Sequence, residues 1–296
     1  MITTRQLRYF DALVRHGHFG RAADAVGVSQ PALSTQIREL EAFLGGPLLE
    51  RGSVDHRLTP LGTEVAERTA SILAALRDLE EVGRGRAGML SGPLRLGVIP
   101  SIAPYLLPRL LPLLQERHPA LRLTLREAVT AVLVEELKSG ALDAIVVSVP
   151  LGDPALAERA AAEDRFLLAV PSASPLARLE RATADLVDAD ELLLLADGHC
   201  LRDQALAVCR RIDPNRLRGF GATSLTTILQ LVAAGQGITL LPEVAADEGV
   251  RADPRLKLLP FRDPQPGRVI GLAWRKGSPR QRDFAALTER IGEALR

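Results

Sequence analysis

The sequence predicts an α/β protein with an N-terminal helix-turn-helix domain, a long connecting helix and a C-terminal α/β domain. Three observations support this prediction. Residues 4–44 contain short helical patterns separated by glycine, and residues 60–82 form one continuous amphipathic pattern. From Leu94 onward, short apolar runs alternate with helical patterns, which favours an α/β domain with mainly parallel sheets.

The first sixty residues read as three helices followed by a hairpin. A second helix is predicted over residues 20–26 and a third over residues 31–44. Ser29 is the N-cap candidate of the third helix, and Pro31 lies in its first turn, where a missing N–H does no harm. Residues 48–58 predict a short β-hairpin, or wing.

A tight turn at Gly27 between two helices is typical of a helix-turn-helix that binds DNA. The N-terminal residues of the second helix then face base edges, so the candidates for base contacts are Gln30, Ser34 and Gln36. The candidates for phosphate contacts are Arg38, Arg51 and Arg57. A generic helical bundle with a solvated polar face also fits, because residues 1–60 hold seven Arg against six Asp and Glu.

The pattern over residues 60–82 predicts one helix of more than twenty residues, with Thr59 as its cap and Pro60 at its first position. Such a helix after a small domain suits a dimerisation element or a spacer. Residues 83–93 contain four glycines and are the predicted linker.

The C-terminal half alternates between two kinds of pattern. The predicted strands are residues 94–98, 121–125, 144–149, 166–170 and 238–241, and the predicted helices are residues 103–116, 129–139, 201–211, 224–234 and 281–295.

Composition excludes several classes of protein. The 296 residues carry 37 basic and 36 acidic side chains, so coating of nucleic acid by bulk charge is excluded, whereas a local basic face is not. Two cysteines cannot form a disulfide framework. The N-terminus lacks the apolar stretch of a signal peptide, and no apolar run approaches a membrane span. We therefore expect a cytoplasmic protein that contacts no membrane.

Cys200 and Cys209 have different surroundings. Cys209 fits the apolar face of a predicted helix and reads as a core residue. Cys200 has polar neighbours and begins that helix, an environment that favours a reactive, solvent-accessible thiolate. Burial as an inert side chain remains an open alternative for Cys200. A zinc site is disfavoured because two Cys and one His do not supply four ligands at known spacings.

The nine-residue separation of the cysteines limits what they can do. Nine helical residues span about 13 Å, whereas a disulfide needs Cα atoms within about 7 Å. A bond between Cys200 and Cys209 would therefore require the helix between them to melt or rearrange, which makes the pair a candidate switch.

Two stretches resemble the LysR-type transcriptional regulators: AADAVGVSQPALSTQIRELEAFLG, followed by LLER and RLTPLG, and ATSLTTILQLVAAGQGITLLPEVA near the C-terminus. The resemblance implies a winged helix-turn-helix over 1–60, a dimerising linker helix and hinge over 61–92 and a regulatory domain over 93–296. It implies two lobes like those of periplasmic binding proteins: lobe I over 93–163 plus 268–296, and lobe II over 164–267. The recognition positions are then Ser29, Gln30, Pro31, Ser34 and Arg38. Dimers would pair into tetramers on operator DNA.

A second set of motifs, GHCLRDQA with a later Cys and GVIPSIAPYLLP, is similar to the members of that family that sense hydrogen peroxide. The resemblance implies that peroxide oxidises Cys200 to sulfenic acid and that Cys209 resolves it as a disulfide. It further implies a switch in transcription of peroxide-defence genes through RNA polymerase and reduction by glutaredoxin-type proteins. No cofactor or metal is expected.

The same resemblance supplies the expected peroxide pocket: Ser101, Thr130, His199, Asp203 and Arg268. Ser101 stands where these regulators usually carry Thr, so the hydroxyl is retained but its rotamer is less fixed. Without the resemblance, Ser101 and Thr130 read as capping or turn residues. Two other functions remain open: a regulator that binds a small metabolite and has incidental cysteines, and a thiol peroxidase.

Overall fold

The computed structural model describes residues 1–50, 57–84, 88–187, 191–208 and 222–296. The chain divides into two compact units. One comprises Met1–Arg86 with Lys138–Ala141, and the other comprises Ala87–Leu137 and Leu142–Arg296. Across the described ranges, no helix has both the length and the hydropathy needed to cross a membrane.

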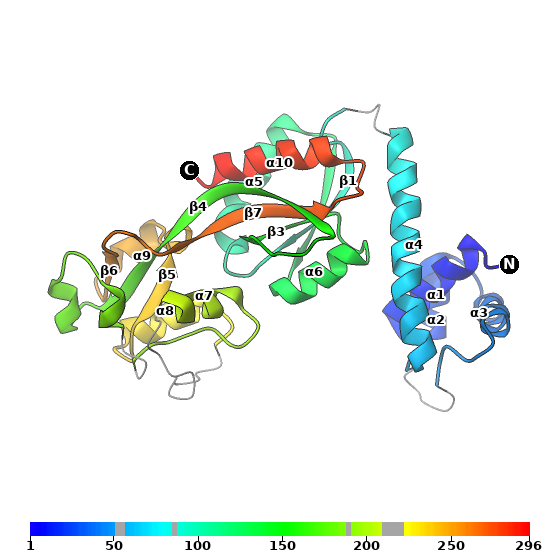
Figure 1. Ribbon diagram of the computed structural model, residues 1–296, viewed down its shortest axis with the longest axis horizontal. Helices are drawn as coiled ribbons and strands as arrows, with labels where there is room; N and C mark the ends of the chain where they lie inside the picture. Colours follow the sequence, from blue (N-terminus) through cyan, green and yellow to red (C-terminus); the bar gives the residue numbers. More distant parts are fainter. Residues whose placement is uncertain (51–56, 85–87, 188–190, 209–221) are drawn as a thin grey trace. The chain divides into compact units, whose positions relative to one another are not determined.

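The described part of the first unit is built from the helices α1 (Thr4–His16), α2 (Phe19–Val26), α3 (Gln30–Leu44) and α4 (Pro60–Arg84) (Figure 1). A capping box closes the start of α1, where the Gln6 amide donates to the Thr3 hydroxyl and the Thr3 amide donates to Oε1 of Gln6. Gly27, at φ 70°, ends α2 in the left-handed conformation that glycine adopts without strain. These elements confirm the predicted helix-turn-helix.

A small apolar core holds this unit together. Its fully buried members include Phe10, Leu33, Ile37 and Leu40. An antiparallel bridge between Leu49 and Leu58 confirms the base of the predicted hairpin, while residues 51–56 lie outside the described residues.

The long helix α4 presents both buried and exposed apolar residues. Leu73 and Ala74 are buried, whereas Ile72 is 47% exposed and Leu79 is 68% exposed. The turn Lys138–Ala141 belongs to the same unit, and Arg77 donates from Nη2 to the Gly140 carbonyl at 2.8 Å.

The second unit is an α/β domain. Its strands are β1 (Gly92–Val98), β2 (Leu121–Glu127), β3 (Ala144–Val149), β4 (Leu156–Pro171), β5 (Thr239–Pro242), β6 (Leu256–Pro260) and β7 (Gly267–Arg275). Its α-helices are α5 (Ala103–Arg117), α6 (Thr130–Lys138), α7 (Cys200–Val208), α8 (Leu225–Ala233), α9 (Glu248–Ala252) and α10 (Gln281–Ala294). Short 3₁₀ turns lie at Pro175–Arg178, Ala184–Leu186 and Glu243–Ala245.

The prediction of mainly parallel sheets is wrong for this domain. The strand order is β2-β1-β3-β7-β4-β5, with β6 also paired to β4. Among the strands of the described residues, β1–β2 and β1–β3 pair in parallel, and β3–β7, β4–β7, β4–β5 and β4–β6 pair antiparallel. Isolated parallel bridges also join Ala182 to Phe261 and Leu192 to Ile238. The chain returns through β7 late in the sequence, and this strand runs against both of its neighbours.

Strand β4 is longer than the sequence predicts and joins two parts of the domain. Its residues Leu156–Arg165 pair with β7, and its residues Phe166–Pro171 pair with β5 and β6. Figure 1 shows β4 and β7 as long neighbouring strands that run between the two parts.

Two separate hydrophobic cores lie on either side of the point where β4 changes its pairing partners. The first core includes Leu96, Leu106, Val146 and Phe284. The second core includes Phe166, Leu193, Ile228 and Leu241. Side chains near this point of β4 therefore lie where the two cores meet.

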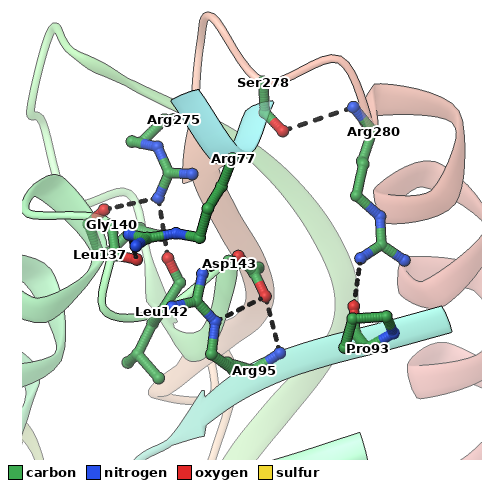
Figure 2. Close-up of polar contacts among 10 residues, drawn as sticks. All are labelled: Arg77, Pro93, Arg95, Leu137, Gly140, Leu142, Asp143, Arg275, Ser278 and Arg280. Atoms are coloured by element: carbon green, nitrogen blue, oxygen red, sulfur yellow. Dashed lines mark hydrogen bonds and ion pairs between the residues drawn. The ribbon is translucent and has the colours of Figure 1, made fainter. Parts of the chain in front are cut away.

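Arginine side chains on β7 and β1 contact the segment between α6 and β3 (Figure 2). Arg275, at the end of β7, donates from Nη1 to the carbonyls of Leu137 and Leu142 at 2.9 and 2.8 Å. Arg95 on β1 donates from Nε to Asp143 at 3.2 Å. These contacts fix the segment that leads from α6 into β3.

Candidate functional site

The DNA-binding candidates lie on or beside α3. The Ser29 hydroxyl accepts from the Ala32 amide as the predicted N-cap. Gln30, Pro31 and Arg38 are exposed along with Ser29. The first turn of α3 is therefore accessible to a partner.

The remaining candidates of this set are placed differently. Ser34 and Gln36 are half-buried, and Gln36 donates from its amide to Glu39 at 2.8 Å. Arg57 is exposed beside the hairpin. Arg51 lies outside the described residues.

Cys200 is the first residue of α7 and carries a free thiol. It is half-buried and packs against the first core, whereas Leu201 and Ala205 of the same helix belong to the second core. The expectation of an open polar setting is thus only partly right, because α7 turns Cys200 toward the junction of the two cores. Cys209 follows α7 and lies outside the described residues.

A cavity of about 790 Å³ opens at this junction. Its walls include four of the predicted site residues: Thr130, Cys200, Asp203 and Arg268. The structure therefore gathers residues from α6, α7 and β7 that lie as far as 138 positions apart, from residue 130 to residue 268.

Arg268 is the most constrained side chain of the cavity. It donates from Nε to Asp164 Oδ2 at 2.8 Å, and the two side chains are 1% and 2% exposed. It also donates from Nη1 to the Ser101 hydroxyl at 2.8 Å and from Nη2 to the Ser101 carbonyl at 3.2 Å. A buried guanidinium with a carboxylate partner stays charged and fixed in direction.

Two polar atoms of the cavity-lining residues are left without partners. The Thr130 hydroxyl and the Oε1 atom of Gln204 are buried and accept or donate no hydrogen bond within the described part of the chain. The Gln204 amide donates to the Ser148 hydroxyl at 2.7 Å, which holds Oε1 in place. Buried polar atoms of this kind usually find a partner, so a small polar ligand or water fits here.

Ser101 and His199 do not line the cavity. Ser101 is buried and reaches the site only through Arg268, and it also lines a separate cavity of about 90 Å³. His199 is buried directly before α7, and its carbonyl accepts from the Arg202 amide. Both residues can therefore support the site without touching a ligand in the larger cavity.

Sequence reasoning missed three residues of this arrangement: Ser148, Asp164 and Gln204. Gln204 could have been found, because it lies one helical turn after Cys200 and so shares its face. Ser148 and Asp164 lie on β3 and β4 and carry no motif, so only strand pairing brings them to α7 and β7.

Comparisons with known proteins cover both parts of the chain. Residues 4–63 match the family model of bacterial regulatory helix-turn-helix proteins of the lysR family. Residues 87–296 match the model of the LysR substrate binding domain.

Named relatives match over almost the full length. A probable hydrogen peroxide-inducible genes activator of Streptomyces viridosporus is 42% identical over 295 residues, 98% of this chain and 94% of the relative. The DNA-binding transcriptional dual regulator OxyR of Escherichia coli K12 is 40% identical over 287 residues, 97% of this chain and 94% of the relative.

Solved structures agree with these relatives. A cysteine variant of full-length OxyR from Pseudomonas aeruginosa matches with a TM-score of 0.83 and 33% identity, over 98% of this chain and 95% of that chain. A cysteine-to-serine variant of Corynebacterium glutamicum OxyR with hydrogen peroxide bound matches with a TM-score of 0.68 and 34% identity, over 99% and 92%. The chain therefore belongs to the LysR family of bacterial helix-turn-helix transcriptional regulators.

Proposed function

We propose that this protein is a hydrogen-peroxide-sensing transcription regulator whose sensor is Cys200. The observation that carries the proposal is the placement of Cys200 at the first turn of α7, in the wall of one cavity with Arg268 and Thr130. A cation and a helix start both favour a thiolate, and a hydroxyl can hold a peroxide oxygen. One relative above is named a probable hydrogen peroxide-inducible genes activator and another is named OxyR, and these names support hydrogen peroxide as the signal.

The proposed oxidation is a displacement at oxygen. The Cys200 thiolate sulfur bonds to one peroxide oxygen while the O–O bond breaks. The hydroxide that leaves takes up a proton and departs as water. Cys200 is thereby oxidised by two electrons to a sulfenic acid, and peroxide is reduced.

The proposed second step forms the disulfide. The Cys209 thiolate attacks the Cys200 sulfur, the S–O bond breaks, and the oxygen leaves as water after protonation. Cys200 and Val208 are the two ends of α7 and lie about 12 Å apart along a helix. Cys209 follows Val208 directly in the sequence, and a disulfide needs Cα atoms within about 7 Å, so this separation must shorten before the sulfurs can bond. The helix therefore unwinds on oxidation, and a glutaredoxin-type dithiol restores it by thiol–disulfide exchange.

In this function the chain has a DNA-binding part over 1–60, a linker over 61–92 and a regulatory part over 93–296. The regulatory part has lobe I over 93–163 plus 268–296 and lobe II over 164–267. Exposed apolar side chains at Ile72 and Leu79 support pairing of two copies along α4. A tetramer on operator DNA, with RNA polymerase as the downstream partner, completes the proposal.

The test maps the disulfide by mass spectrometry after near-stoichiometric peroxide without reductant. Trypsin cleaves after Arg202, so Cys200 and Cys209 fall on separate peptides. We expect these peptides to be cross-linked and Cys200→Ser to abolish the peroxide-dependent change in DNA binding. Two intact thiols under excess oxidant would overturn the proposal.

A regulator that binds a small metabolite is the second candidate function. The cavity of about 790 Å³ favours it, because that volume is typical of sites for small organic ligands and greatly exceeds one peroxide molecule. In that case Cys200→Ser would leave the response to the inducing compound intact.

A further inference from the structure

The ion pair of Asp164 and Arg268 stands out among the charged groups near Cys200. Both side chains are almost fully buried, and they lie directly opposite each other in the register of β4 and β7. The pair therefore lies on the two strands that connect the two cores, and both residues line the cavity together with Cys200.

Asp164 is itself held firmly. Its Oδ2 accepts from Arg268, while its Oδ1 accepts from the Val244 amide at 3.0 Å. One oxygen is anchored to the backbone, so the carboxylate acts as a fixed point for the guanidinium. Ser101 then sets the rotation, because it accepts from both Nη atoms.

The guanidinium keeps donors for another partner. It has five N–H bonds, and three are used within the described residues, which leaves one N–H on each Nη atom. Arg268 lines the cavity, so these donors suit a thiolate or a peroxide oxygen.

The same cavity is lined by other charged side chains. Glu163, Asp203 and Asp263 line the same cavity, as does a second cation, Arg165. A guanidinium released from Asp164 would pair with one of these carboxylates and move away from Cys200, because a charged group follows the nearest opposite charge.

We propose that Asp164 is a positioning residue for the Cys200 reaction: it holds the Arg268 guanidinium where its free donors stabilise the thiolate. This inference rests on the proposed function for its biological meaning, but it makes a separate statement about the state of the thiol.

The first experiment measures Cys200 alkylation by iodoacetamide against pH in the full-length protein, with Cys200 followed on its own tryptic peptide. Asp164→Asn is compared with wild type and with Glu163→Gln, which removes the same charge from the same cavity without touching Arg268. For Asp164→Asn we expect the half-maximal pH to rise by about one unit and the peroxide reaction at neutral pH to slow by ~10-fold or more.

The direction of the shift in half-maximal pH distinguishes a positioning role of Asp164 from a direct effect of its negative charge on the thiol. If Asp164 acted only as a nearby negative charge, its removal would favour the thiolate, and the half-maximal pH would fall in both variants. A fall or an unchanged value in Asp164→Asn overturns the proposal. Should Asp164→Asn fail to fold, Asp164→Glu keeps the buried charge but displaces the guanidinium, and the same rise is expected; an unchanged value overturns the proposal.

A double-variant cycle tests whether Asp164 acts through Arg268. Arg268→Met slows the reaction, and adding Asp164→Asn to it should slow it no further. A further loss of reaction rate equal to the loss that Asp164→Asn causes alone would contradict the proposal. If wild-type Cys200 alkylates normally but peroxide leaves it intact, the proposed function fails, while the shift in alkylation still decides the role of Asp164.

Discussion

Asp164 and Arg268 are directly opposed in the antiparallel pairing of β4 and β7, and the guanidinium Nε lies 2.8 Å from the carboxylate. Gly267, the residue before Arg268, has no side chain, and a Cβ placed there would lie 2.8 Å from the Asp164 carbonyl oxygen. The strands can therefore approach closely enough to bury the ion pair. Asp164 and Arg268 therefore belong both to the cavity wall and to the two strands that join the two cores.

Gly267→Ala is expected to destabilise the protein by about 1–3 kcal/mol, because the added methyl meets backbone atoms that cannot move away alone. Gly277→Ala is the control, since a Cβ there meets nothing within 4 Å, and its effect should stay within about 0.5 kcal/mol. Urea unfolding of both variants checks the difference. Equal effects would show that β4 and β7 can separate at no cost.

Ser101→Ala should cost about 1–3 kcal/mol of stability, because it leaves the buried Nη1 donor of Arg268 without its hydroxyl acceptor. Ser101→Thr keeps the hydroxyl and should retain the hydrogen bond. Denaturant unfolding and the rate of peroxide-dependent oxidation of Cys200 are the measurements. If Ser101→Ala behaves as wild type in both, the hydrogen bond has no part in fixing Arg268.

Two variants of α3 should separate base contacts from phosphate contacts. Arg38→Ala is expected to weaken binding to all DNA sequences and to reduce the salt slope by about one. Gln30→Ala, on the exposed first turn, is expected to lose about 1–3 kcal/mol of discrimination between specific and random DNA and to leave the salt slope unchanged. Fluorescence titration against specific and random duplexes at several salt concentrations measures both quantities. The reverse assignment of effects would show that α3 docks differently.

Tyr105 should titrate late at alkaline pH. It lies on α5 but packs against the second core. Burial raises the pKa of its phenol, and the negative charge of Asp247 adds to this rise. A hydrogen bond with Thr226 lowers the pKa and so opposes the shift. A folded pKa above the unfolded value means that the associated stability is complete below about pH 10 and is lost as pH rises through the raised pKa.

The near-ultraviolet absorbance of phenolate checks this expectation. Tyr105→Phe should remove the late transition, whereas Tyr9→Phe, which changes the other tyrosine of the chain, should leave it in place. A late transition that survives in Tyr105→Phe would contradict the assignment.

Local pattern was enough to predict the helices of the first unit and most elements of the second. Caps and glycines mark α2 and α3 because they satisfy or release specific backbone groups, and these effects act over a few residues. Cys200 at the start of α7 was predicted for the same reason. Motifs that resemble the LysR family supplied the expected lobes of the regulatory domain and the expected pocket residues.

Local sequence pattern did not predict how the strands pair. The segment Leu156–Arg165 is rich in alanine and charge, which favours a helix locally, yet it forms the first half of β4 because β7 pairs along its length. Strands β6 and β7 went unpredicted, and with them the antiparallel character of the sheet.

The sequence by itself determined the helix-turn-helix, the long helix, the alternation of strands and helices and the position of Cys200 at the start of α7, because each depends on neighbours along the chain. Only the tertiary structure decided that Asp164 holds Arg268, that Ser101 supports the cation from outside the cavity and that Gln204 meets Ser148. Those contacts join residues 56 to 167 positions apart. No local propensity encodes them; they arise when burial of two apolar cores brings β4, β7 and α7 together.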